Sequence, residues 1–301
     1  MKKVYKIVLV LSCVTTLFFV GCHKKETVEV DNETQSSVDN AVADQEYMSI
    51  VPATNGHAIN TKGTGANNGK LSMPNPCDTL HWLNRTSSYN AGNTTYPIAD
   101  TNLVNNKYVS APIYELNLLP AACPSAFTDG KIRTGKWIIR ITGPLKLVGS
   151  QMILKLVNHK ASGITYSCDS MVVTTTATTA ISSSFNIKLI NGVCSSPNWT
   201  IKYRFDRTFT NYAKGNPVGT DPFVEVFGTA NGVNRVGKAF EVNIPQASPL
   251  IKHKNCQYID KGILELTPEG FKTRTVDFGN GTCDDDATFT VNGSTVAFKL
   301  K

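Results

Sequence analysis

The sequence lacks the short motifs that mark common active sites. It has no Gly-x-Ser-x-Gly nucleophile turn, no His-Glu-x-x-His pair and no glycine-rich phosphate loop. Its histidines are isolated, and no Cys-x-x-Cys or Cys/His cluster has the spacing of zinc ligands. We therefore expect no enzyme activity, no cofactor and no zinc site.

A concentrated basic surface is also missing. The net charge is +7, but Lys2, Lys3 and Lys6 supply three of these charges at the extreme N-terminus. The remaining Lys and Arg residues are scattered along the chain, whereas nucleic-acid surfaces gather positive charge on one face. We expect no nucleic-acid partner.

The N-terminus carries an export signal. After the three lysines, residues 7–20 form an almost unbroken apolar run that ends at Gly21-Cys22. The run is too short for a membrane span, which needs about 20 apolar residues, and its flanks are those of a signal segment. Phe19-Val20-Gly21-Cys22 resembles the lipobox of bacterial lipoproteins, in which a thiol accepts a diacylglyceryl group. A second candidate, Cys13, follows a shorter run.

This pattern predicts three regions. Residues 1–21 are a lipoprotein signal peptide, and Cys22 carries the lipid. Residues 22–46 are polar and acidic with few large apolar side chains, a composition that predicts a disordered, flexible tether. Residues 47–301 are a β-rich globular region. Nothing after residue 25 has the pattern of a long amphipathic helix.

Period-2 alternation of apolar and polar residues predicts an all-β fold of antiparallel strands, as a sandwich or an extended meander. The clearest hairpin flanks Asn292-Gly293, a pair that suits a type I′ turn. The expected strands are 113–119, 137–141, 152–157, 185–189, 199–206, 223–227, 240–244, 263–266, 287–291 and 294–300.

An Arg-x-Gly-Lys sequence occurs twice before such strands, at 133–136 and at 235–238. It indicates either two related sheet units or a coincidence in a β-rich chain, and the residues do not choose between them.

Two segments carry a family resemblance. Residues 130–163 and 274–293 resemble a pattern of uncharacterised Bacteroidota cell-envelope lipoproteins. The resemblance covers about the C-terminal half of the chain. It implies an all-β envelope protein of unassigned role and supplies no catalytic residues.

Six cysteines remain once Cys13 leaves with the signal and Cys22 takes lipid. An even number in an exported chain predicts disulfides, and six cysteines allow 15 pairings. Their even placement suggests that neighbours pair. The predicted bonds are Cys77–Cys123, Cys168–Cys194 and Cys256–Cys283.

Oxygen ligands and carboxylates suggest two further sites. Asp277, Asp284 and Asp286 lie in an acidic stretch that could bind calcium. Its spacing is not that of an EF-hand, and a solvated turn between strands is the ordinary interpretation. Glu225, Glu241 and Glu265 could serve a glycosidase, which needs a spaced pair of carboxylates. They occupy the polar positions of alternating strands, so outward-facing sheet residues are the ordinary interpretation.

Two further features of the sequence suggest contact with glycans. Trp82, next to His81 and Asn84 in an expected loop, could stack on a sugar ring. Thr79 and Ser170 each sit in an Asp-Ser/Thr-apolar sequence, which resembles the O-glycosylation motif of Bacteroidota.

The sequence thus favours a lipid-anchored cell-envelope protein of structural, adhesive or ligand-binding role. We expect it at the outer membrane, facing the periplasm or the surface. Its expected partners are the membrane, through the lipid, and glycans or other envelope proteins. The alternatives are a glycan-acting hydrolase and a glycan-binding surface protein.

Overall fold

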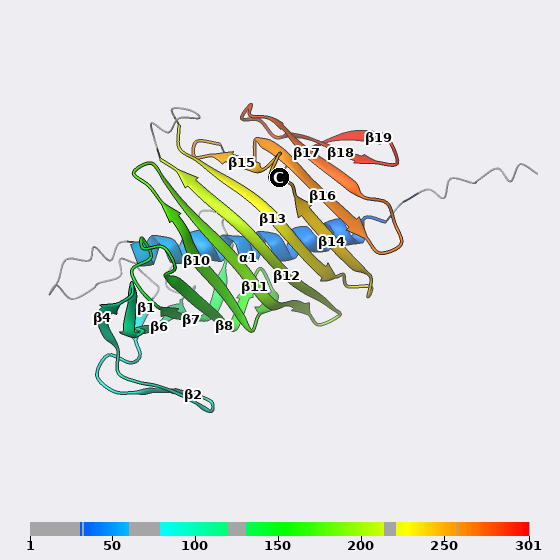
Figure 1. Cartoon of the computed structure of the whole chain (residues 1–301). Coiled ribbons are helices and arrows are strands. Elements are labelled where there is room, and N and C mark those ends of the chain that lie inside the picture. The colour runs from blue at the N-terminus through cyan, green and yellow to red at the C-terminus, as the bar shows by residue number, and fades with distance from the viewer. Residues whose placement is uncertain are drawn as a thin grey trace, which may run out of the picture. The chain divides into compact units, whose positions relative to one another are not determined.

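The computed structural model describes residues 31, 33–59, 79–119, 131–213, 221–256 and 258–300 (Figure 1). Residues 31–301 group into one compact unit. Within the described residues there is one helix, α1 (Gln35–Ile59), and the remaining regular structure is β-strand. The all-β prediction is confirmed.

Most strands belong to one antiparallel sheet. They are β1 (Thr79–Trp82), β6 (Ile113–Leu118), β7 (Arg133–Ile141), β8 (Gln151–Ala161), β9 (Ile164–Ser167), β10 (Ser170–Thr178), β11 (Ser182–Ser196), β12 (Trp199–Tyr212), β13 (Phe223–Val233), β14 (Ala239–Ile244), β15 (Leu250–His253), β16 (Lys261–Pro268), β17 (Arg274–Asn280), β18 (Asp286–Val291) and β19 (Ser294–Lys299). Two small hairpins stand apart from it: β2 (Tyr89–Ala91) with β3 (Thr94–Tyr96), and β4 (Asp100–Val104) with β5 (Lys107–Ser110).

The sheet is an extended meander. Its order is β1-β6-β7-β8-β10-β11-β12-β13-β14-β16-β17-β18-β19, so most strands lie beside their neighbours in sequence. Of the two architectures that the sequence allowed, the meander is therefore the one adopted. β9 and β10 share one position between β8 and β11 and keep one register on both sides, with a break at Cys168-Asp169.

Each strand expected from the alternation falls on a strand of this sheet. The ends of 113–119 and 294–300 agree to within a residue, whereas 199–206 is only the first part of β12. The expected type I′ hairpin is also present. Asn292 and Gly293 have φ of 53° and 75°, and they join β18 to β19 in register. Such a turn needs positive φ at both central residues.

One face of the sheet packs against α1, and we call it the inner face. Along β12, for example, Ile201, Tyr203 and Phe205 are buried there, while Lys202 and Arg204 are exposed on the outer face. Trp137, Met152 and Leu154 continue the same core on β7 and β8. Burial of this apolar surface is the main force that holds the sheet and helix together.

Helix α1 corrects the sequence prediction. It begins at Gln35, inside the region 22–46 expected to be a flexible tether, so that prediction is wrong for the helical residues 35–46. Its buried side chains recur at helical spacing: Ser36, Asp39, Asn40, Ala43, Glu46, Tyr47 and Ile50. Four of these seven side chains are polar. An apolar stripe is the usual sequence signal of a buried helix face, and here that signal is missing.

The polar face of α1 is matched by cations and hydroxyls of the inner face. Glu46 accepts hydrogen bonds from Arg133 Nε and Nη2 at 2.8 and 2.9 Å, and its Oε1 lies 2.9 Å from His159 Nε2. Toward the helix N-terminus, Asp44 pairs with Arg207 at 2.6 Å and Asp39 with Arg235 Nε at 2.7 Å.

The pairing continues ahead of the helix. Arg274 Nη2 donates to Asp31 Oδ1, and Arg274 Nε donates to the Glu33 carbonyl at 2.9 Å. Glu33 Oε1 in turn accepts from Ser36 N at 2.8 Å, which satisfies an amide of the first helical turn. The helix thus crosses the strands from β17 to β7, with an acid over a buried arginine at several steps.

These contacts explain the repeated Arg-x-Gly-Lys sequence. Arg133 and Arg235 both reach acids of α1, Glu46 and Asp39. Gly135 and Gly237 both have positive φ, 101° and 84°. Gly135 lies at a register shift inside β7, and Gly237 lies in the turn before β14. Both copies lie within residues 31–301, which group into one compact unit.

Candidate functional site

A pocket of about 370 Å³ lies on the outer face of β7 and β8. Its lining comes from the sheet and from the small hairpins: Tyr96, Pro97, Lys107, Tyr108, Val109, Ser110, Ala111, Arg140, Thr142, Gln151 and Ile153. The inner face packs against α1, whereas this pocket lies on the opposite face, where a small ligand could enter.

Local sequence explains how the pocket is walled. Arg140 and Ile153 are directly paired across β7 and β8 and both point outward, opposite the buried Ile139 and Leu154. The β4–β5 hairpin turns at Asn105-Asn106, whose φ values of 50° and 64° fit a type I′ turn.

The hairpin is fixed to the end of β7. Tyr108 N donates to the Thr142 carbonyl at 2.7 Å. A Cβ at Gly143 would clash with the Asn106 carbonyl, so glycine allows the hairpin tip to approach. These contacts hold β5 above the outer face and leave the pocket between them.

The lining is cationic. Arg140 and Lys107 contribute positive charge, and no Asp or Glu is among the residues that line the pocket. The Arg140 guanidinium lies over the Tyr96 ring, 5.8 Å from its centroid, within the range of a cation–π contact. Burial raises the pKa of Tyr108, so its hydroxyl stays protonated. This set of groups suits an anion that also offers a surface to aromatic rings.

Apolar side chains are exposed beside the pocket. Ile98, Leu103, Val104 and Val109 are each about half or more exposed, and Val109 also lines the pocket. Isolated exposed apolar residues are common, but a group of them beside a polar pocket indicates a contact surface.

Trp82 is not the loop residue that the sequence suggested. It lies in β1, packs against the core, and its ring is 5.5 Å from that of Tyr114. Asn84 is fully buried and structural: it accepts hydrogen bonds from Trp82 Nε1 and Ile113 N and donates to the Pro97 and Ala111 carbonyls. The expected loop position of Trp82 is therefore wrong, and its contact with a sugar ring stays a prediction.

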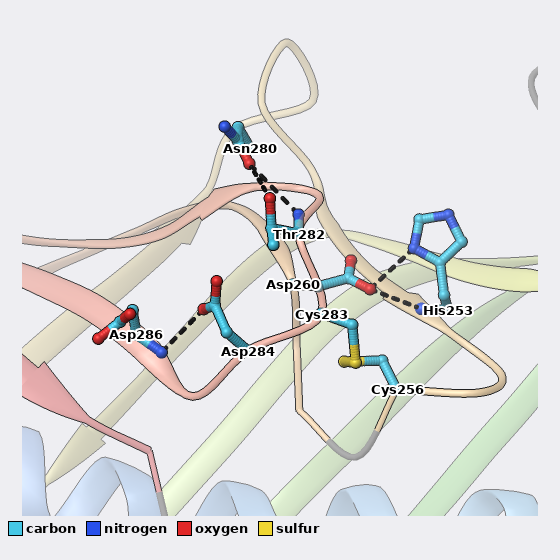
Figure 2. The surroundings of a disulfide bond; sticks show 8 residues. All are labelled: His253, Cys256, Asp260, Asn280, Thr282, Cys283, Asp284 and Asp286. Atoms are coloured by element: carbon cyan, nitrogen blue, oxygen red, sulfur yellow. Dashed lines mark hydrogen bonds and ion pairs between the residues drawn. A yellow bond between two sulfur atoms is a disulfide. The ribbon is translucent and has the colours of Figure 1, made fainter.

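The cysteine predictions have different outcomes. Cys256 and Cys283 form a disulfide, with their Cα atoms 5.5 Å apart, as predicted (Figure 2). Cys168 and Cys194 are free thiols, so the bond predicted between them is not formed. Cys22, Cys77 and Cys123 lie outside the described residues.

Cys168 and Cys194 nevertheless lie on adjacent strands. Cys194 is opposite Tyr166 in the β9–β11 pairing, two residues from Cys168. Burial raises the pKa of Cys168 to about 11 and that of Cys194 to about 12. Such thiols are poor nucleophiles at neutral pH.

The acidic stretch near the disulfide does not gather into a metal site. Asp277 Oδ1 accepts from Gly279 N and Asp284 Oδ1 from Asp286 N, so both carboxylates cap their own turns (Figure 2 shows the second). Asp286 also lies 2.8 Å from Lys299 Nζ. Among the described residues there is no group of three or more His, Cys, Asp or Glu placed to hold a metal ion. The calcium hypothesis gains no support.

A buried carboxylate stands near the same disulfide. Asp260 Oδ2 lies 2.8 Å from His253 Nδ1 and accepts from His253 N at 3.3 Å (Figure 2). This pair closes the loop between β15 and β16, and neither residue was identified from the sequence.

Of the three glutamates considered for a glycosidase, Glu241 and Glu265 are diagonal neighbours on the adjacent strands β14 and β16, and Glu225 lies on β13. Glu241 is exposed on β14, and Glu265 on β16 accepts from Asn243 Nδ2 at 2.8 Å. Glu225 lies on β13 between β12 and β15, and burial raises its pKa. The two O-glycosylation candidates differ in access, since Thr79 is exposed and Ser170 is half-buried.

No family model, curated protein or solved structure matches this chain. Among the described residues, no helix is both long and apolar enough to cross a bilayer. The interpretation of the site therefore depends on its own geometry.

Proposed function

We propose that this chain is a lipid-anchored cell-envelope protein that binds an anionic ligand in the outer-face pocket. The observation that carries the proposal is the pocket itself, in which Arg140 and Lys107 stand without an acid among the lining residues. Arg133, Arg207 and Arg235 pair with acids of α1, whereas Arg140 and Lys107 are directed to a hollow open to solvent.

The chemistry of the lining favours an acidic saccharide. Tyr96 and Tyr108 offer aromatic surface, while Ser110, Thr142 and Gln151 offer polar atoms. Sugar rings pack on aromatic faces, and a carboxylate or phosphate group would pair with a guanidinium. The role is binding, with no catalytic step proposed.

The lipid anchor rests on the N-terminal sequence. The three lysines, the apolar run and Gly21-Cys22 support export and acylation at Cys22. The resemblance to Bacteroidota envelope lipoproteins adds to this reading, and with it the placement at the outer membrane. Nine residues link Cys22 to Asp31, which would span about 30 Å when fully extended.

Binding is tested by calorimetry with three probes: an oligosaccharide that contains glucuronate, the matching neutral oligosaccharide, and vesicles of an anionic phospholipid. We expect heat with the acidic oligosaccharide alone. Arg140→Ala should abolish it, and Lys238→Ala, at an exposed site in another turn, should leave it unchanged. Binding of the neutral sugar with equal affinity, or loss in both variants, would contradict the pocket assignment.

The same samples address the hydrolase alternative. Chromatography of the oligosaccharide after incubation should return the starting material unchanged. Shortened products that disappear in a Glu225→Gln variant would replace the binding role with a catalytic one.

A further inference from the structure

The last strand of the sheet offers an unpaired edge. Within the part of the chain that the structure describes, β19 pairs with β18 alone, from Val291↔Ser294 to Asp286↔Lys299. It lies at the end of the sheet opposite β1, next to β18 (Figure 1). Every residue of β19 is exposed.

The register shows which backbone groups are free. Leu300 N donates to the Asp285 carbonyl at 2.8 Å, so the even-numbered residues of this strand direct their backbone groups toward β18. The N–H and C=O groups of Thr295, Ala297 and Lys299 therefore point away from the sheet.

This edge has little of the usual protection. Natural edge strands carry proline, bulges or free charges that prevent pairing with another chain. β19 has no proline and keeps a regular register with β18. Its single charged residue, Lys299, is held by Asp285 at 2.6 Å and Asp286 at 2.8 Å.

The exposed side chains on the edge are apolar. Val296 is 59 % exposed and Phe298 38 % exposed. They lie on the same face of the strand and pair with Phe289 and Ala287 of β18. An apolar row thus runs to the edge of the sheet and stops there.

We propose that β19 pairs antiparallel with β19 of a second copy of this chain, about a two-fold axis at Ala297. In this register Ala297 faces the partner's Ala297, and Thr295 faces the partner's Lys299. All outward backbone groups of the strand then meet outward groups of the other copy.

The same register pairs side chains favourably. Val296 lies opposite the partner's Phe298, and the two-fold axis repeats this contact. Pairs of an aromatic and a β-branched residue stabilise antiparallel strands. A two-fold interface uses one patch twice, and β19 supplies a patch that complements itself, whereas a foreign strand would have to bring its own complement. The interface is small, so the dimer is a transient one, favoured where an anchor confines copies to one surface.

Disulfide trapping tests the register in cells that express the full chain. Ala297→Cys places one thiol opposite its own copy, and we expect a band of doubled mass on a non-reducing gel after mild oxidation. Val236→Cys, at a 66 % exposed position in a distant turn, is the matched control and should give at least about tenfold less. Equal trapping at both positions, or none at residue 297, would overturn the proposal.

A second pair of variants tests the backbone contact in purified full-length protein. Ala297→Pro removes an N–H that β18 does not use, and we expect the dissociation constant of the dimer to rise about tenfold or more. Ala297→Val keeps that N–H and should preserve the dimer. Light scattering gives the mass and circular dichroism confirms folding. A folded Ala297→Pro variant that dimerises as before would show that copies meet elsewhere. An unmodified chain that stays monomeric would contradict self-pairing, and β19 would then be available to a strand of another protein.

Discussion

Glu46 is an ionisable residue on the face of α1 that packs against the sheet. It is fully buried, and it is bonded to Arg133 and His159. Burial alone would raise the pKa of Glu46, but the hydrogen bonds from His159 and Arg133 outweigh it and lower the pKa below the ordinary 4.5. The carboxylate therefore stays ionised in the folded protein, where it balances a buried cation.

Replacing this carboxylate should be costly. Glu46→Gln removes the carboxylate that pairs with the buried Arg133, and we expect the free energy of unfolding to fall by about 3–5 kcal/mol. The control is Glu115→Gln, whose partner Lys136 is 3.2 Å away in a partly exposed pair, with an expected loss below about 1 kcal/mol. Urea denaturation measures both, and similar losses in the two variants would contradict the role given to Glu46.

The same group predicts a pH dependence. Because the folded-state pKa of Glu46 is lowered, its contribution to stability is present above about pH 4.5 and is lost as the pH falls toward the lowered value. Urea midpoints measured from pH 7 down to pH 3 should show this loss in the native chain and a flatter profile in Glu46→Gln. Parallel profiles would assign the acid sensitivity to other carboxylates.

The two free thiols give a prediction that also tests the disulfide hypothesis. With their pKa values raised to about 11 and about 12 by burial, Cys168 and Cys194 carry at most about one thiolate in a thousand at pH 8. Iodoacetamide should leave both unmodified in the folded protein and modify both after denaturation without reductant. If denaturation released neither, the bond predicted from the sequence between these two residues would form after all.

At the scale of elements, the sequence pattern predicted the strands but did not predict the helix. Period-2 patterns such as Trp199 to Asp206 reflect one buried face, so they predicted strands correctly. Helix α1 has an equally buried face, but its Asp39 and Glu46 are buried through ion pairs with Arg235 and Arg133, distant in sequence. Composition alone cannot distinguish such acids from those of a solvated segment.

The outer-face pocket was missed for a related reason. Tyr96, Lys107 and Arg140 come from three separate segments, and only the folding of the β4–β5 hairpin over β7 and β8 brings them together. By contrast the Cys256–Cys283 bond followed from spacing along the chain, and the structure contains it.

Helix α1 should stabilise the whole sheet through Tyr47. This side chain is fully buried, its ring stacks beside Tyr203, and its hydroxyl donates to the Ser167 carbonyl at 2.6 Å and the Val193 carbonyl at 3.1 Å. Those carbonyls lie on β9 and β11, where the sheet is interrupted at Cys168.

Tyr47→Ala removes this contact, and we expect the free energy of unfolding to fall by about 3–5 kcal/mol. Val38→Ala, on the same helix and 50 % exposed, should change it by less than about 0.5 kcal/mol. Hydrogen exchange of amides in β9 and β11 would show whether the loss is local or shared by the sheet. Equal stability of the two variants would mean that α1 is only loosely docked.

At the scale of the whole molecule, the helix shortens the expected linker between Cys22 and the folded region. The sequence suggested a tether through residue 46, yet Asp31 is already bonded to Arg274 of the sheet. Under the proposed acylation at Cys22, the linker is then nine residues and not about 25. A short linker would confine anchored copies near one surface, which favours encounters between them.

The anchor itself is tested by two cysteine variants of the full chain. Cys22→Ala should abolish incorporation of labelled palmitate and move the protein out of the membrane fraction, because the remaining apolar run is too short to span a bilayer stably. Cys13→Ala is the matched control, since it removes a thiol nine residues earlier and should leave labelling and membrane association unchanged. If Cys13→Ala were the variant that lost the label, acylation would occur within the predicted signal, and the linker to Asp31 would be twice as long. If both variants kept it, another residue would carry the lipid, and proximity to the bilayer would no longer support pairing through β19.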